Sequence, residues 1–325
     1  MAGNRRSFFK TAGAGAAALA LGEVMAGRAF ADEGRHEGFI KQVLGARIID
    51  LSHTWDENSP IASVNPPYSM SLAATHAGTR GTFGDGGKLS FTAEVQHFSG
   101  QHGAPSIDAI GHIGRNGKLF GGVDAAQSTS DPRGIGRDEP AHTGAHLDID
   151  HYPVELLVNR GVLLDVARFV NGDSTPLDAN VKVTGRLLKD TAHRQKVKLQ
   201  RGDTVLIRTG WGQYFSKDPA TYSGPNSAGV DVDGAKFLIN SGARVVGNDT
   251  LTFEFRPPLN GSGADFEVFP VHMLVIADNG VNIIENFNLE EIATAGEHEF
   301  ALVVPPLRIR GGTGSALRSF ALVPS

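Results

Sequence analysis

Cysteine is absent from this sequence of 325 residues, which excludes disulfides, thiolate metal sites and a cysteine nucleophile. Any metal ion would therefore be held by histidine, carboxylate or other oxygen ligands. An excess of basic residues is also missing, because 30 Lys and Arg stand against 35 Asp and Glu, so we predict no nucleic-acid partner. Hydrophobic residues make up 40% of the chain, which is typical of globular proteins and excludes a mainly disordered one.

No long hydrophobic run is present either, and a mildly apolar segment lies near the N-terminus. The chain begins with NRRSFFK (4–10), continues with an Ala- and Gly-rich run (11–22) and then reaches Ala-Phe-Ala (29–31). NRRSFFK resembles the bacterial twin-arginine export signal, and Ala-Phe-Ala has the small-x-small pattern of a signal-peptidase site. A run of about a dozen residues is too short to span a bilayer stably. We therefore predict a cleaved signal peptide over 1–31, a periplasmic mature chain over 32–325 and no stable membrane anchor; an amphipathic N-terminal helix is the alternative.

The hydrophobic pattern of the mature chain predicts one domain with more strands than helices. Alternating or continuous apolar runs indicate strands at 46–55, 89–98, 160–169, 201–211, 243–249 and 280–287, with another beginning at 300. Helical patterns cover 178–200, 233–241 and 272–279, and the Gly-rich stretch 78–87 predicts a loop.

Twelve histidines prompt a search for a metal site with nitrogen and oxygen ligands. The densest group is His102, Ser106, Asp108 and His112. Residues two apart on an extended segment point to the same side, so Ser106 and Asp108 could face one site. If a helix begins at Asp108, the four-residue spacing places Asp108 and His112 on one helical face. Carboxylate and imidazole suit Zn or Mn, whereas hydrogen-bonded surface residues in a Gly-rich loop are the alternative.

The segment 102–112, HGAPSIDAIGH, resembles the signature H-x-G-T-H-x-D-x-P-x-H of the cyclase family, which includes bacterial kynurenine formamidases, isatin hydrolases and related lactone hydrolases. Ala104 and Pro105 replace the Gly-Thr, and Ser106 stands where the family usually has its second metal-binding histidine. Further family-like strings follow in the same order as in the family: DLSH (50–53) precedes the signature, and RGVLLDV (160–166), RGDTVLIRTGW (201–211), FPVHMLVI (269–276), IIENFNLEEI (283–292) and PPLRIRGGTGSALR (305–318) come after it.

This resemblance implies a fold and a set of site residues. The expected fold is α/β, a swivelling β/β/α-type domain with a central barrel-like mixed sheet flanked by helices, and the expected assembly is a homo-oligomer. His102, Asp108, His272 and Glu285 match metal ligands, while His112 matches the histidine that acts as general acid or base; Glu285 is also a catalytic candidate. Because Ser106 replaces a ligand, we expect one divalent ion, Zn or Mn, although a site too weak to hold metal is the alternative.

Two further positions are candidates for lining the site, beside Ser106. The string HTGAHLD (142–148) also has the H-x-G-x-H-x-D pattern, but Tyr152 occupies the place of its final histidine. We therefore expect 142–151 to form a loop near the pocket mouth, where His146 either contacts substrate or lies on the surface. Trp211 either packs on a planar substrate or fills the core, the commoner role of tryptophan.

The leading functional hypothesis is a metal-dependent hydrolase of a small cyclic or aryl amide, lactone or ester. Metal-activated water would attack the carbonyl, and His112 would move the proton. A serine nucleophile is disfavoured because no G-x-S-x-G string is present. The alternatives are a metal-free periplasmic protein that binds a small molecule with the same fold, and a cyclase or dehydratase that uses the same site.

Overall fold

The computed structural model describes residues 38–101, 103–137 and 143–325. The predicted signal peptide and His102 lie outside the described residues. The chain divides into two compact units, of which one holds 1–47 with 324–325 and the other holds 48–323. In the first unit, residues 38–45 are helical. No helix in the described part of the chain has the length and apolar character needed to cross a membrane.

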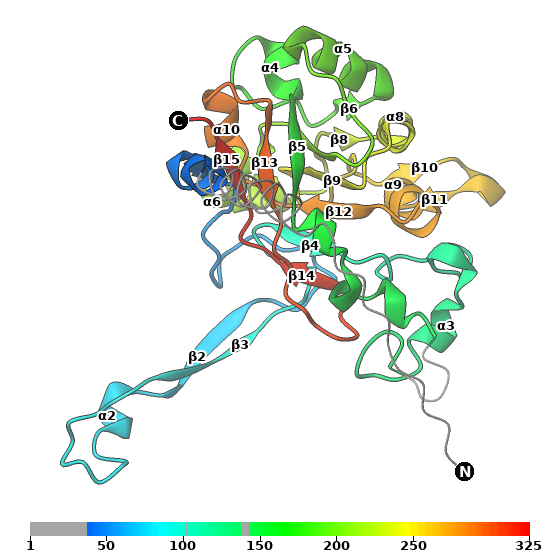
Figure 1. Ribbon diagram of the computed structural model, residues 1–325. Helices are drawn as coiled ribbons and strands as arrows, with labels where there is room; N and C mark the ends of the chain where they lie inside the picture. Colours follow the sequence, from blue (N-terminus) through cyan, green and yellow to red (C-terminus); the bar gives the residue numbers. More distant parts are fainter. Residues whose placement is uncertain (1–37, 102, 138–142) are drawn as a thin grey trace, which may run out of the picture. The chain divides into compact units, whose positions relative to one another are not determined.

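The second unit is built on a mixed sheet of nine strands that curls into a half-barrel (Figure 1). The central neighbours β5, β7, β9 and β12 run parallel, whereas β13, β15, β4 and β14 pair antiparallel. In spatial order the strands are β1 (Arg47–Asp50), β15 (Phe320–Val323), β13 (Glu299–Val303), β5 (Val158–Asp165), β7 (Thr204–Arg208), β9 (Val245–Asn248), β12 (Asn282–Glu285), β4 (Ser106–Asp108) and β14 (Gly314–Ala316). The α/β fold with a barrel-like mixed sheet is thereby confirmed.

Both faces of the central strands are buried, which explains their continuous apolar runs. Two hydrophobic cores lie on the two faces of these strands. In β5, Val162 and Leu164 point into the first core, while Leu163 between them points into the second core. Strand β7 repeats this pattern, with Val205 on the first side and Leu206 on the second. Successive side chains of a strand point to opposite faces, so a strand covered on both sides needs apolar residues at every position.

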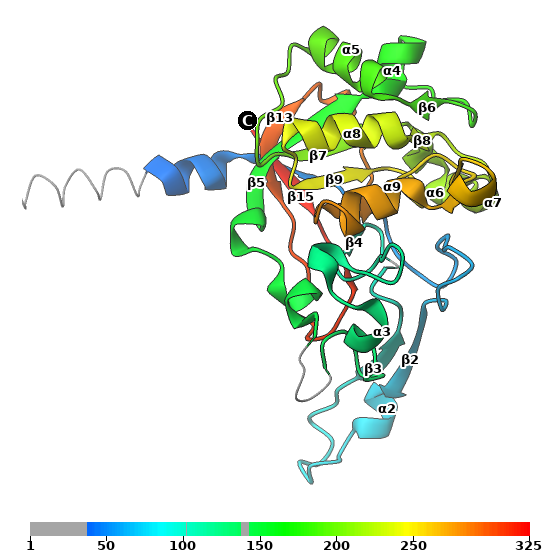
Figure 2. The same cartoon turned by 90° about the vertical axis from the view of Figure 1, so that its right-hand side faces the viewer.

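Helices α5 (Gly185–Gln195) and α8 (Val232–Ser241) contact each other and supply buried side chains to the first core, and they lie beside the central strands in Figure 2. Each begins at a residue whose side chain accepts a backbone N–H, Thr184 for α5 and Asp231 for α8. The shorter helices are α2 (His76–Thr79), α3 (Ala125–Ser128), α4 (Val166–Asn171), α6 (Tyr214–Lys217), α7 (Pro219–Ser223), α9 (Pro270–His272) and α10 (Glu290–Thr294), and α9 continues as the π-helical turn η7 (Met273–Ala277).

Several elements differ from the sequence predictions: β4, β14 and β15 were not predicted, the strand predicted over 46–55 ends at Asp50, and α2 overlaps the start of the predicted loop 78–87. Three further differences have a clear local cause. The strand predicted over 160–169 ends at Asp165, because the carboxylate of this residue accepts the backbone N–H of Arg168 and begins α4. The helix predicted over 178–200 is confined to α5, which ends where Lys196 adopts a left-handed conformation. No helix begins at Asp108, since this residue ends β4 and a turn follows.

A two-stranded hairpin of β2 (Ser69–Ala74) and β3 (Ala93–His97) extends away from the sheet (Figure 1). Every residue of β3 is exposed, and only Ala74 of β2 is partly covered. Two further short pairs join β6 (Lys182–Val183) to β8 (Gly229–Val230) and β10 (Leu259–Asn260) to β11 (Glu267–Val268).

Candidate metal and catalytic site

The site is formed where β4 and β12 meet α9. Glu285, the last residue of β12, pairs with Ser106 across the antiparallel ladder. Asp108 lies two residues further along β4, so its side chain points to the same face as that of Glu285 and forms a diagonal pair with it. His272 approaches this face from α9. The register of the sheet thus brings two carboxylates and one imidazole together.

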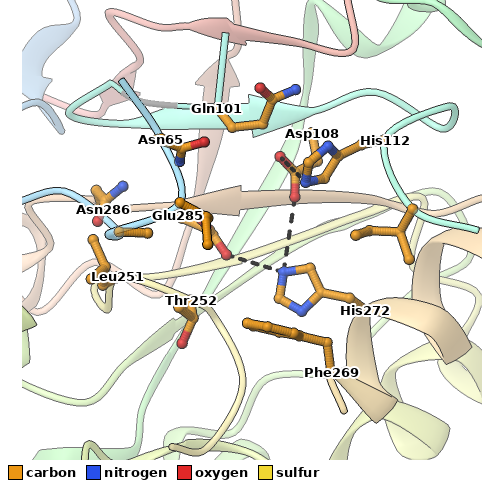
Figure 3. Close-up of a pocket in the computed structure, with 13 residues that line it drawn as sticks. Asn65, Gln101, Asp108, His112, Leu251, Thr252, Phe269, His272, Glu285 and Asn286 are labelled. Carbon is orange, nitrogen blue, oxygen red and sulfur yellow. Dashed lines mark hydrogen bonds and ion pairs between the residues drawn. The ribbon is translucent and has the colours of Figure 1, made fainter. Parts of the chain in front are cut away.

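These three side chains, the ligand cluster, point toward one another in Figure 3. One ligand atom from each of Asp108, His272 and Glu285 lies within 4.8 Å of the others. His272 Nε2 is 3.2 Å from Glu285 Oε1 and 3.9 Å from Asp108 Oδ2. Asp108 and His272 are 3% and 4% exposed, and Glu285 is 9% exposed. The cluster therefore offers two oxygen ligands and one nitrogen ligand to a single ion.

A third carboxylate holds the opposite side of the same imidazole. Glu254 Oε1 lies 2.5 Å from His272 Nδ1, and the carboxylate also accepts the backbone N–H groups of Val271 and His272. Sequence reasoning missed Glu254, since it lies in the segment TFEFRPP (252–258), which matches no ligand pattern. Only the tertiary structure identifies it.

The electrostatics of the cluster favour a cation. Burial opposes the charged form of His272, but hydrogen bonds to Glu254 and Glu285 outweigh it and place the pKa of His272 well above 6.5. Burial raises the pKa of Glu285 to about 7; the His272 hydrogen bond opposes this shift, and the charge of Asp108 adds to it. Three buried carboxylates thus surround one imidazole, and no Lys or Arg is among the described residues that line the cavity. Oxygen and imidazole donors carrying this charge fit Zn or Mn.

His112 lies beside the cluster at its more exposed edge. Its Nε2 is 3.9 Å from Asp108 Oδ1, and its side chain is 30% exposed. It follows the turn after β4, so the same strand end carries both Asp108 and His112. This position suits a group that exchanges protons with solvent and with a molecule in the cavity.

The cavity above the cluster has a volume of about 210 Å³. Its walls combine apolar side chains with side-chain amides, which sequence reasoning did not identify. Beside the ligand cluster and His112, it is lined by Ala62, Val64, Asn65, Gln101, Ile113, Leu251, Thr252, Phe269 and Asn286.

Asn286 connects this wall to the backbone around it. Its side chain donates to the carbonyl of Gly103 and accepts from the hydroxyl of Tyr222, and its φ of 62° lies in the left-handed region. Asparagine tolerates this conformation better than most side chains. The residue next to Glu285 is therefore held from both sides.

The other predicted site residues that the structure describes do not line the cavity, although Ser106 lies directly beside Glu285 in the sheet. Ser106 is buried, and its hydroxyl donates to the carbonyl of Gln101. Trp211 fills the first core, and its indole N–H donates to the carbonyl of Leu177. His146 is exposed, in the 3-10 turn Ala145–Leu147. None of these three is among the described residues that line the cavity.

Comparisons with known proteins agree with this architecture. Residues 49–255 match the family model described as "Putative cyclase". An isatin hydrolase from Roseibium aggregatum is 25% identical over 202 residues, which cover 56% of this chain and 72% of the relative. A crystal structure described as that of a novel cyclase has a TM-score of 0.70 at 26% identity, covering 87% of this chain and 89% of that one. An isatin hydrolase bound to the product analogue thioisatinate has a TM-score of 0.63 at 19% identity, covering 90% and 99%. The family model spans more than half of the chain, and the chain therefore belongs to the cyclase family.

Proposed function

We propose that this protein is a metal-dependent hydrolase of a small cyclic or aryl amide, lactone or ester. The observation that carries the proposal is the buried convergence of Asp108, His272 and Glu285 beneath a cavity that His112 also lines. The similarity to an isatin hydrolase supports hydrolysis as the reaction class. When bound, a divalent ion such as Zn or Mn polarises a carbonyl group and acidifies a water molecule.

The site residues of this chain have separate roles in the proposed reaction. The ligand cluster holds the ion, and Glu285, expected both as a ligand and as a catalytic group, serves as a ligand in this proposal. His112 takes the proton of the attacking water at an imidazole nitrogen and delivers it to the leaving group. General acid–base groups contribute about 10²–10⁴-fold to a rate, and because His112 delivers the proton that it has taken, it ends the reaction in its starting protonation state.

The lining of the cavity supports an uncharged substrate. Phe269 and Leu251 offer apolar contact to a ring, while the amides of Asn65 and Gln101 can bond polar atoms at its edge. No lysine or arginine is among the described lining residues to pair with a carboxylate or phosphate on the substrate. Neutral lactones, imides and aryl amides fit this arrangement.

The test is metal removal and restoration with a substrate panel. Dialysis against a chelator abolishes hydrolysis of the lactones, aryl formamides or cyclic imides that the enzyme accepts, and Zn or Mn restores it. Incorporation of ¹⁸O from labelled water identifies hydrolysis. Product formed without water incorporation would favour the cyclase or dehydratase alternative, and substrate binding by a metal-free, inactive protein would favour the binding-protein alternative.

We also propose that the chain is exported to the periplasm by the twin-arginine pathway and assembles as a homo-oligomer. The NRRSFFK string supports export. The β2–β3 hairpin supports assembly, because it exposes Met70, Leu72 and Val95. An isolated two-stranded ribbon is marginally stable in water, so contact with a second copy would stabilise it.

A further inference from the structure

Glu254 is a buried carboxylate bound to one imidazole. It is 1% exposed, and its oxygens accept three hydrogen bonds from two consecutive residues. Oε1 lies 2.5 Å from Nδ1 of His272 and 3.1 Å from its backbone N, and Oε2 lies 3.3 Å from the backbone N of Val271. The carboxylate is therefore fixed to the same turn of backbone that carries the imidazole.

This contact determines which nitrogen of His272 faces the ligand cluster. An ionised carboxylate only accepts hydrogen bonds, so Nδ1 of His272 carries the proton that points to Glu254. In the neutral ring, Nε2 then has a free lone pair directed at Glu285 and Asp108, whose oxygens lie 3.2 and 3.9 Å away. Two carboxylates facing Nε2 favour a cation between them, either the proton of the hydrogen bond to Glu285 or a metal ion that replaces this proton.

The same arrangement distinguishes a metal ligand from a proton-relay pair. A histidine that activates a hydroxyl nucleophile has a carboxylate on one nitrogen and the hydroxyl on the other. His272 has a carboxylate on Nδ1, but its Nε2 faces two further carboxylates instead of a hydroxyl group. An ionised carboxylate has no proton for Nε2 to remove, so this histidine does not activate a nucleophile.

We propose that Glu254 is a positioning residue of the metal site, which holds His272 in the Nδ1–H tautomer and directs Nε2 to the ion. The inference rests on the proposed function, since it requires an ion bound by the ligand cluster. Glu254 lies on the far side of the ring from that cluster, so it acts through His272 and not as a ligand. Its negative charge also makes the imidazole a stronger donor.

The first measurement is the Zn²⁺ affinity of full-length variants, by competition with a chromophoric chelator. Glu254→Gln keeps the size of the side chain and loses its charge, and Glu254→Leu loses every hydrogen bond. Removal of such a partner typically costs about 10–100-fold in metal affinity, so we expect a loss of that size for Glu254→Gln and a larger one for Glu254→Leu. Glu290→Gln is the matched control, because Glu290 bonds Arg208 and does not contact His272; its affinity stays within about twofold of the unsubstituted protein.

The second measurement reports the tautomer, which a purely structural role would not change. Long-range ¹H–¹⁵N spectra of histidine-labelled, Zn²⁺-loaded protein should show His272 protonated at Nδ1, with its signals identified by their loss in His272→Gln. In zinc-loaded Glu254→Leu, coordination through Nε2 keeps the proton on Nδ1, but the Nδ1–H resonance should lose the downfield shift that its hydrogen bond to Glu254 gives it, while the other histidines keep their signals. If Glu254→Leu does not fold, the spectrum of the unsubstituted protein and the affinity of Glu254→Gln still decide the question.

Three outcomes would overturn the inference, and they have different consequences for the proposed function. A His272 protonated at Nε2, or Glu254 variants that bind Zn²⁺ as tightly as the unsubstituted protein, would refute the positioning role alone. Failure of the unsubstituted protein to bind Zn²⁺ or Mn²⁺ would refute the metal-dependent function and the inference together.

Discussion

Asp108→Asn removes one negative charge from the ligand cluster while nearly preserving the shape of the side chain. The backbone carbonyl of Asp108 accepts a hydrogen bond from Asn282 Nδ2 at 2.7 Å, which the substitution leaves in place. Strand β4 should therefore keep its position, and the consequences should be electrostatic.

In the metal-free protein, the effects of this change should nearly cancel. Asp108 attracts protonated His272 at 3.9 Å and repels ionised Glu285, whose ligand atom lies within 4.8 Å. With an effective dielectric constant of about 20, the attraction is worth about 4 kcal/mol. Above about pH 7, where Glu285 is ionised, the repulsion is worth at least about 3 kcal/mol with the opposite sign. The free energy of unfolding without metal should therefore change by only about 1 kcal/mol.

With metal, the loss should be large. Changes to groups that merely orient a ligand weaken metal binding by about 10–100-fold, so removal of a charged ligand should cost about 100-fold or more. An ion at 100 times its dissociation constant stabilises the unsubstituted protein by about 2.7 kcal/mol, and a 100-fold weaker site reduces this to about 0.4 kcal/mol at the same concentration.

The assay is urea unfolding with and without Zn²⁺, followed by circular dichroism. Asp150→Asn is the matched control, since Asp150 pairs with Arg308 and does not line the cavity, and its Zn²⁺-induced stabilisation should equal that of the unsubstituted protein. Equal stabilisation of Asp108→Asn would refute the assignment of Asp108 as a ligand. A metal-free variant destabilised by several kcal/mol would show that the carboxylate is needed for folding instead.

Four other predictions follow from the same structure and sequence. His112→Ala should lower kcat by about 10²–10⁴-fold with unchanged Zn²⁺ affinity, and unchanged turnover in steady-state assays would remove it from the mechanism. Burial lowers the pKa of His53 to about 4, against the backbone hydrogen bond that raises it. Below about pH 6.5 the imidazole of His53 binds a proton in the unfolded chain but not in the folded protein. The free energy of unfolding should therefore decrease by about 2 kcal/mol on acidification from neutral pH to pH 5. His53→Phe, which retains a ring to stack on Phe215, should unfold with a shallower pH dependence, and an unchanged slope would contradict the assignment. Replacing Arg5 and Arg6 by Lys should leave precursor in the cytoplasm, and mature protein in the periplasm would refute the twin-arginine prediction. Light scattering should give a mass of at least two chains, whereas a monomer would refute assembly.

The sequence by itself indicated the central strands of the sheet, although not β4, β14 or β15. The continuous apolar runs in β5 and β7 mark strands buried on both faces, because only such strands need apolar residues at every position. The order of the family-like strings also predicted the fold class and drew attention to Asp108, His272 and Glu285. The apolar runs can be recognised because they depend on periodicity within short segments, whereas the fold class and the roles of His272 and Glu285 were implied only by the resemblance to the cyclase family.

The tertiary structure alone decided how those segments meet. The register of β12 against β4 places Glu285 diagonally across from Asp108, and the approach of α9 places His272 between that pair and Glu254. No local pattern encodes the Glu254 contact, because any acidic residue in any loop could in principle be brought to that nitrogen. The position of Trp211 in the core was equally undecided, since the same strand end can point an indole inward or toward a cavity. Such contacts depend on the packing of the whole unit, whereas strand and helix formation depends mainly on neighbours in the chain.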